Sequence, residues 1–168
     1  MKDNDIRPAS IMTKQEILID KDAVNLSKKT RFFKKVECPS CGSKKSIFFL
    51  RKRFFNYQIC SKCETYFMSP RPTEKILDNH YRTSLNMKYW SDKIFPISRK
   101  KRIKYIYKPR AIYLIKSLKK LKRNNRSHSY LEIGAADGTF AKEIRRLKYF
   151  KKYLLVEPNP RLAKQSIK

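Results

Sequence analysis

Four cysteines constrain this chain more than any other feature. They are the only cysteines in 168 residues, and they form two C-x-x-C pairs, Cys38 with Cys41 and Cys60 with Cys63, separated by 18 residues. Each pair predicts a tight turn whose two sulfurs converge, and four thiolates at this spacing suit a tetrahedral zinc ion. Because four protein ligands close such a site to substrate, we predict a structural role for the zinc.

Disulfide bonds and a redox C-x-x-C are the alternative uses of these cysteines. Nothing at the amino terminus resembles a signal peptide, because Asp3 and Asp5 interrupt the start and no apolar core follows. No stretch approaches the roughly 20 apolar residues of a membrane span. We therefore expect a cytoplasmic chain without a membrane span, where structural disulfides are rare. A single redox motif would not explain two pairs.

The segment between the cysteine pairs predicts two strands, one containing Ile47–Leu50 and the other Phe54–Tyr57. With the cysteine turns they make a zinc ribbon. Several basic residues of this segment can contact phosphate, namely Lys44, Lys45, Arg51, Lys52 and Arg53. A non-enzymatic zinc-ribbon protein that binds nucleic acid is therefore the alternative function.

A second motif surrounds two of the three glycines in the chain, Gly134 and Gly138. The apolar run before them predicts a buried strand at residues 129–133, residues 139–150 have a helical pattern, and residues 153–157 predict a second strand. Two strands joined by a helix form a right-handed parallel unit, and ligands bind at the carboxyl ends of its strands. Glu132, the glycine loop and Glu157 all fall at these ends.

The chemistry of this loop favours a nucleoside ligand that carries a positive charge. Glu157, at the end of the second strand, can accept two hydrogen bonds from ribose hydroxyls. The pattern is E-x-G-x-x-x-G, with Ala136 where a middle glycine would stand, rather than the G-x-G-x-x-G of a dinucleotide site. The Glu132 carboxylate would repel a pyrophosphate, which disfavours a nicotinamide-dependent enzyme.

The stretch Glu132-Ile-Gly-Ala-Ala-Asp-Gly138 resembles motif I of class I S-adenosylmethionine-dependent methyltransferases, and Glu157 in Leu-Leu-Val-Glu-Pro-Asn-Pro resembles the acid of their motif II. The resemblance implies an α/β fold with a Rossmann-like, doubly wound sheet and S-adenosylmethionine as the cofactor. Ala136 departs from the usual glycine. The cofactor-binding residues that the resemblance implies are Glu132, Gly134, Ala135, Ala136, Asp137, Gly138 and Glu157.

The ribbon, followed by Pro70-Arg-Pro-Thr73 and a helix with Tyr81 near its end, is similar to the amino-terminal module of a group of bacterial methyltransferases. Many of these serve surface-polysaccharide or nucleotide-sugar pathways, which implies a sugar or another small metabolite as the methyl acceptor. Together the two resemblances cover roughly residues 36–168. No catalytic residue can be assigned from them.

The motifs predict four parts: a polar tail or helix at 1–35, the zinc-ribbon-like module at 36–72, a helical connector at 73–97 and the start of the methyltransferase domain at 98–168. Residues 98–121 carry apolar side chains at helical spacing, and Pro109 is expected to break or kink that helix near Lys108. A polar linker, 122–129, follows. Two strands are too few for a stable parallel sheet, so we expect a truncated enzyme of little activity, completed only by a downstream polypeptide.

The charge balance allows two interpretations. There are 42 Lys and Arg residues against 14 Asp and Glu, a net charge of +28. Such an excess indicates a polyanionic partner such as nucleic acid. The basic residues are scattered from end to end, however, which favours a compositional bias as the cause.

Overall fold

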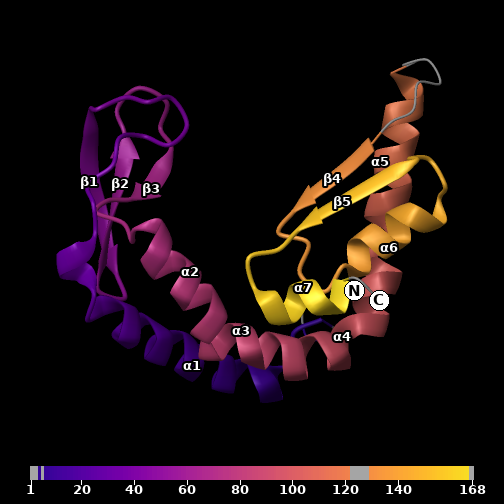
Figure 1. The fold of residues 1–168 in the computed structure, drawn as a ribbon, viewed down its shortest axis with the longest axis horizontal. Helices are drawn as coiled ribbons and strands as arrows, with labels where there is room; N and C mark the ends of the chain where they lie inside the picture. The colour runs from indigo at the N-terminus through magenta and orange to yellow at the C-terminus, as the bar shows by residue number, and fades with distance from the viewer. Residues whose placement is uncertain (1–3, 5, 122–128, 167–168) are drawn as a thin grey trace. The chain divides into compact units, whose positions relative to one another are not determined.

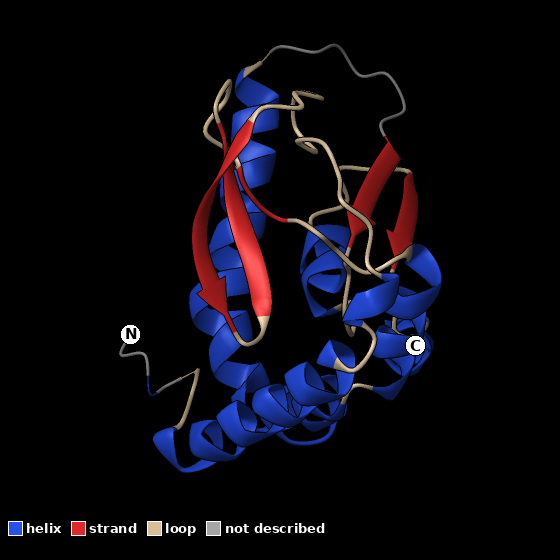
Figure 2. Cartoon of the chain, turned by 90° about the vertical axis from the view of Figure 1, so that its left-hand side faces the viewer, coloured by secondary structure: helices blue, strands red, loops and turns tan. Residues whose placement is uncertain are grey.

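The computed structural model describes residues 4, 6–121 and 129–166, so most of the predicted linker at 122–129 lies outside the described residues. The fold is mixed α/β, with one three-stranded antiparallel sheet, one two-stranded parallel sheet and helices (Figure 1; Figure 2). No helix in the described part is long and apolar enough to cross a membrane. The chain divides into two units, residues 14–86 and residues 1–13 with 87–168.

The ribbon sheet lies in the unit formed by residues 14–86. Its strands are β1 (Ser46–Lys52), β2 (Phe55–Cys60) and β3 (Tyr66–Met68), paired antiparallel in that order. The two strands predicted from the sequence are confirmed, and β3 was not predicted. Arg53 and Phe54 both have positive φ angles, 46° and 74°, as the two-residue turn between β1 and β2 requires.

Three helices belong wholly or partly to the same unit: α1 (Ala9–Ser27), α2 (Glu74–Thr83) and α3 (Leu85–Tyr89). The buried Asp22 carboxylate accepts hydrogen bonds from the Ser84 hydroxyl at 2.6 Å and from the backbone N–H groups of Leu85 and Asn86, both at 2.9 Å. Asp22 therefore caps the start of α3 and fastens α1 to it. Helix α1 also contacts the ribbon directly, through ion pairs of Glu16 and Asp20 with Arg53.

The second unit contains the parallel sheet. Strands β4 (Ser129–Ile133) and β5 (Lys152–Val156) pair in register, with Ile133 beside Val156, and α6 (Thr139–Arg146) connects them. One face of the sheet packs on α6 and on α5 (Lys108–Lys120), where the core consists of Ala111, Tyr130, Ala141 and Ile144. Helix α6 ends earlier than predicted, because Lys148 turns the chain away at φ 51°.

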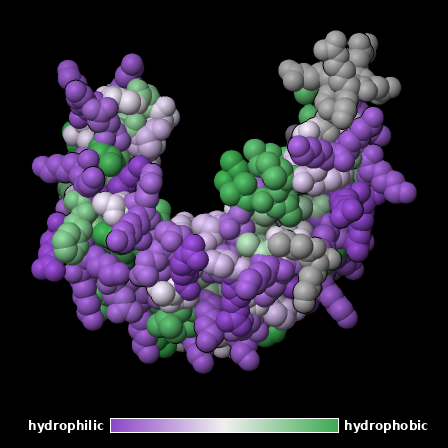
Figure 3. All heavy atoms as spheres, in the orientation of Figure 1, coloured by the Kyte–Doolittle hydropathy of each residue, from purple (hydrophilic) through white to green (hydrophobic). Residues whose placement is uncertain are grey.

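The other face of β4 and β5 is exposed, so the predicted buried strand at 129–133 is present but is buried on one face only. Side chains alternate along each strand, and after the polar Ser129 and Lys152 at the strand starts the outward ones are apolar: Leu131, Ile133, Leu154 and Val156 are 46–79% exposed. Figure 3 shows apolar side chains gathered over these strands. The described residues supply helices to one face only.

The helical segment before β4 passes through its prolines without a break. It runs through α4 (Phe95–Arg102) and α5, joined by a π-helical turn at Ile103–Tyr107, and an equivalent turn at Trp90–Ile94 precedes α4. Each wide turn ends two residues before a proline, Pro96 or Pro109. Proline lacks the N–H that would continue the regular bond pattern, and a wider turn accommodates the loss. The helix does not break at Lys108 as one form of the prediction had it, and the irregularity near Pro109 is the π-helical turn that ends at Tyr107. The last helix is α7 (Pro160–Ser166), and the Asn159 side chain caps its start by accepting the backbone N–H groups of Arg161 and Leu162.

Candidate functional site

The four cysteine sulfurs converge at one place in the ribbon. All four Sγ atoms lie within 4.8 Å of one another. The Cys38–Cys63 distance is 3.5 Å and the Cys41–Cys60 distance is 3.6 Å. With a Zn–S bond of about 2.3 Å, the sulfurs of a tetrahedral site are about 3.8 Å apart, whereas disulfide sulfurs are about 2.05 Å apart. The four cysteines, all free thiols, therefore fit a metal ion such as zinc.

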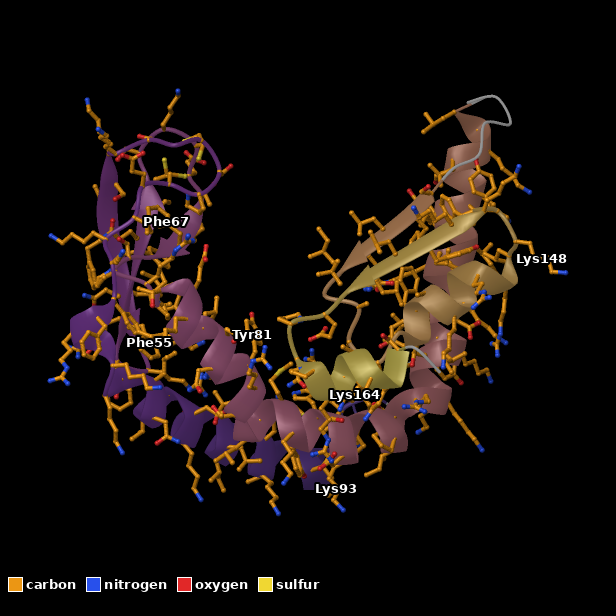
Figure 4. The ribbon with its side chains drawn as sticks, viewed as in Figure 1. Phe55, Phe67, Tyr81, Lys93, Lys148 and Lys164 are labelled. Atoms are coloured by element: carbon orange, nitrogen blue, oxygen red, sulfur yellow. The ribbon has the colours of Figure 1, made fainter. Side chains whose placement is uncertain are left out.

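The two cysteine turns have the same backbone geometry. The residue after each pair is left-handed, Gly42 at φ 69° and Glu64 at φ 58°. The N–H of Gly42 donates to the Cys38 carbonyl at 2.9 Å, and that of Glu64 donates to the Cys60 carbonyl at 3.0 Å. The turn at Glu64, which lacks the usual glycine, thus adopts the same conformation. Figure 4 labels Phe67, which packs on Cys38 and Cys60, in the sheet close to these turns.

Hydrogen bonding distributes charge unevenly among the thiols. The hydroxyl of Thr65, followed by its backbone N–H, lowers the pKa of Cys63 to about 6. The N–H of Ser43 acts to lower the pKa of Cys41, but bonds with the other thiols, Cys63 first, raise it to about 12. Four sulfurs this close cannot all be anionic unless a cation compensates their mutual repulsion. A divalent metal ion supplies that compensation.

The glycine loop of the second unit joins the ends of both parallel strands. The N–H groups of Gly134 and Ala135 donate to the Val156 carbonyl, at 2.7 and 3.2 Å. The Ala136 N–H donates to Glu157 Oε2 at 2.8 Å, while Glu157 Oε1 accepts the Asn159 N–H at 2.9 Å. Glu157 therefore lies directly beside the loop, and its carboxylate holds the loop backbone to the end of β5.

The two loop glycines have different surroundings. Both are left-handed, Gly134 at φ 80° and Gly138 at φ 71°. A Cβ atom on Gly138 would lie 2.8 Å from the Ser166 Cβ, so the packing of α7 requires glycine there. A Cβ atom on Gly134 would meet nothing within 4 Å. Gly134 therefore marks the open side of the loop, where a ligand can reach the backbone.

Glu132 is a partly buried carboxylate at the end of β4. The Tyr130 hydroxyl donates to Glu132 Oε2 at 2.8 Å. Burial raises the pKa of Glu132, and the bond from Tyr130 opposes that shift only in part. Burial also raises the pKa of Tyr130, so this phenol stays protonated. A partly desolvated carboxylate of this kind is stabilised by a cationic neighbour.

Two other residues predicted to bind the cofactor have structural contacts. Ala135 is buried, and so is Asp137. Asp137 Oδ1 accepts the Thr139 N–H at 3.1 Å at the start of α6, and its Oδ2 forms an ion pair with Arg99 at 2.9 Å. The role of Arg99 was not predicted, because its partner Asp137 lies 38 residues later and the sequence around Arg99 does not indicate the contact. A cavity of about 300 Å³ borders this ion pair, lined by Ser91, Pro96, Arg99, Asp137, Thr139, Lys142 and Gln165.

Comparison with known proteins gives no assignment: no protein-family model, no curated protein and no solved structure matches the chain.

Proposed function

We propose that this chain binds S-adenosylmethionine at the Gly134–Gly138 loop and forms the cofactor-binding part of a class I methyltransferase whose ribbon holds a structural zinc. The observation that carries the proposal is the position of Glu157. A parallel strand–helix–strand unit places this carboxylate 2.8 Å from the backbone N–H of Ala136, in the middle of the loop. A ligand resting on the loop would therefore lie within reach of an acid.

The loop residues suit the chemical groups of this cofactor. Each Glu157 oxygen accepts one backbone N–H and retains a further lone pair for a ribose hydroxyl. Gly134 leaves room for the methionine portion to approach the backbone. Glu132 offers a negative charge to a ligand that carries both an ammonium and a sulfonium group. When bound, this cofactor supplies an electrophilic methyl group.

The surrounding fold supports a Rossmann-like, doubly wound sheet. In such sheets helices cover both faces, and the apolar outward residues of β4 and β5 are what a face covered by a second helical layer would require. A sugar or another small metabolite is the proposed acceptor. The catalytic group is not assigned to any residue of this chain.

Titration calorimetry of the zinc-loaded full chain with S-adenosylmethionine tests the proposal, with NADH as the competing ligand. We expect binding of the former only. Glu157→Gln should weaken binding by about tenfold, because hydrogen bonds to charged groups contribute about 1.5–3 kcal/mol. Glu74→Gln removes the same charge from an exposed site on α2 and should have no effect. A folded chain that does not bind S-adenosylmethionine at millimolar concentration would refute the proposal.

A further inference from the structure

The ribbon carries an aromatic pair on its surface. The rings of Phe49 and Tyr66 meet edge to face, with centroids 4.7 Å apart. They come from β1 and β3, the two outer strands of the sheet, so their contact crosses the face of β2. The side chains are nonetheless 49% and 58% exposed. We call Phe49 and Tyr66 the aromatic surface.

Folding of the ribbon does not account for this surface. The buried cluster of the ribbon consists of Cys38, Cys60 and Phe67 instead. Every residue of β1 after Ser46 is exposed, including four consecutive large apolar side chains. Contiguous exposed apolar side chains on a soluble unit mark a binding site.

Basic side chains flank the aromatic surface at both ends of β1. Lys44 and Lys45 precede the strand, Arg51 and Lys52 end it, and all four are exposed. Lys44 forms a long, exposed ion pair with Glu37 at 3.8 Å, and its side chain stays 85% exposed. Arg53 is held more tightly, because its guanidinium forms ion pairs with Glu16 at 2.6 Å and Asp20 at 2.7 Å. Residues 34–72 contain nine Lys or Arg and only two acids, Glu37 and Glu64. The ligand that matches this pattern is a polyanion with flat apolar groups.

We infer that the aromatic surface binds single-stranded nucleic acid, with bases stacked on Phe49 and Tyr66 and phosphates held by Lys44, Lys45, Arg51 and Lys52. Aromatic side chains stack on unpaired bases and accept every base type, while lysine and arginine follow the backbone charge. A duplex keeps its base faces covered and offers the rings no such contact. The inference concerns the ribbon alone and is independent of cofactor binding.

The first test is the salt dependence of binding. Fluorescence anisotropy of a labelled oligothymidylate of about 12 nucleotides, within the usual range of site sizes, is measured with the zinc-loaded full chain. Four phosphate contacts give a slope of about −2.8 in a plot of log K against log salt concentration, at about 0.7 per contact. The double variant Lys44→Gln with Lys45→Gln should reduce the magnitude of this slope by about 1.4. Lys116→Gln with Lys119→Gln removes equal charge from exposed positions on α5 and should leave the slope unchanged.

The second test removes the rings. Phe49→Ala or Tyr66→Ala should weaken binding about tenfold, since stacking contributes about 1–3 kcal/mol per base, and should leave the salt slope unchanged. Tyr113→Ala removes a 74% exposed ring from α5 as a control, and Phe49→Tyr should restore binding. Zinc content of each variant verifies that the ribbon is folded. Equal affinity of ring and control variants, or of duplex and single strand, would overturn the inference. So would ring-dependent binding to anionic phospholipid vesicles without oligonucleotide binding.

Discussion

Adding one methyl group at each loop glycine should have unequal effects on stability. Both positions are left-handed, so alanine costs about 1–2 kcal/mol at either one. At Gly138 the new Cβ would also lie 2.8 Å from the Cβ and 3.0 Å from the Cα of Ser166. Such overpacking adds about 1–3 kcal/mol. We therefore expect Gly138→Ala to destabilise this unit by about 2 kcal/mol more than Gly134→Ala.

Trp90, the single tryptophan of the chain, lies in the same unit and reports its unfolding by fluorescence. In urea, with a slope of about 2 kcal/mol per molar, the two variants should differ by about 1 M in midpoint. Because Gly134 faces open space, its alanine variant should remain folded yet lose affinity for S-adenosylmethionine.

A double variant separates the contact from the backbone strain. Ser166→Gly removes the nearest atom, so Gly138→Ala should cost less in that background, giving a coupling energy of about 1 kcal/mol. Equal midpoints for Gly134→Ala and Gly138→Ala, together with additive effects of Ser166→Gly, would show that α7 does not pack on the loop as described.

Three further predictions concern the metal, a titrating acid and a helix cap. Chelating zinc should abolish hydrogen-exchange protection across β1–β3, because the free energy of zinc binding, about 10–16 kcal/mol, is as large as the free energy of unfolding of a typical domain. Retained protection would refute a structural metal. Burial raises the pKa of Glu132, so ionising this carboxyl in the folded chain lowers stability. That loss is absent below the ordinary glutamate pKa range and grows as pH rises through the pKa of the folded chain. Glu132→Gln should therefore stabilise the unit at neutral pH and not at pH 4, measured by urea midpoints. Asp22→Ala removes the acceptor of three hydrogen bonds and should cost about 2–4 kcal/mol, visible as faster amide exchange in α3; unchanged exchange would contradict the cap.

Features that depend on neighbouring residues were predictable from the sequence. The spacing of the cysteine pairs is a local property of two turns, and the structure brings the four sulfurs together as expected. Asn159 caps α7 by bonds to residues two and three positions ahead. The strand Tyr66–Met68 was missed, because three residues are too few to show a period.

Features that depend on distant partners were not predictable. Asp22 meets the start of α3 more than 60 residues later, and Arg99 meets Asp137. The apolar run at 129–133 fits a strand buried on one face or on two, and only the packing distinguishes them. The cofactor role of the loop stays a prediction.

The uncovered sheet of β4 and β5 also affects how copies of the chain behave in solution. Apolar strands with open edges tend to pair between molecules. The net charge of +28 opposes this association, because like-charged copies repel one another. At 0.1 M salt this repulsion extends over about 10 Å. At 1 M salt that range falls to about 3 Å. Concentrated salt should therefore promote self-association, so that colloidal stability is highest in dilute buffer.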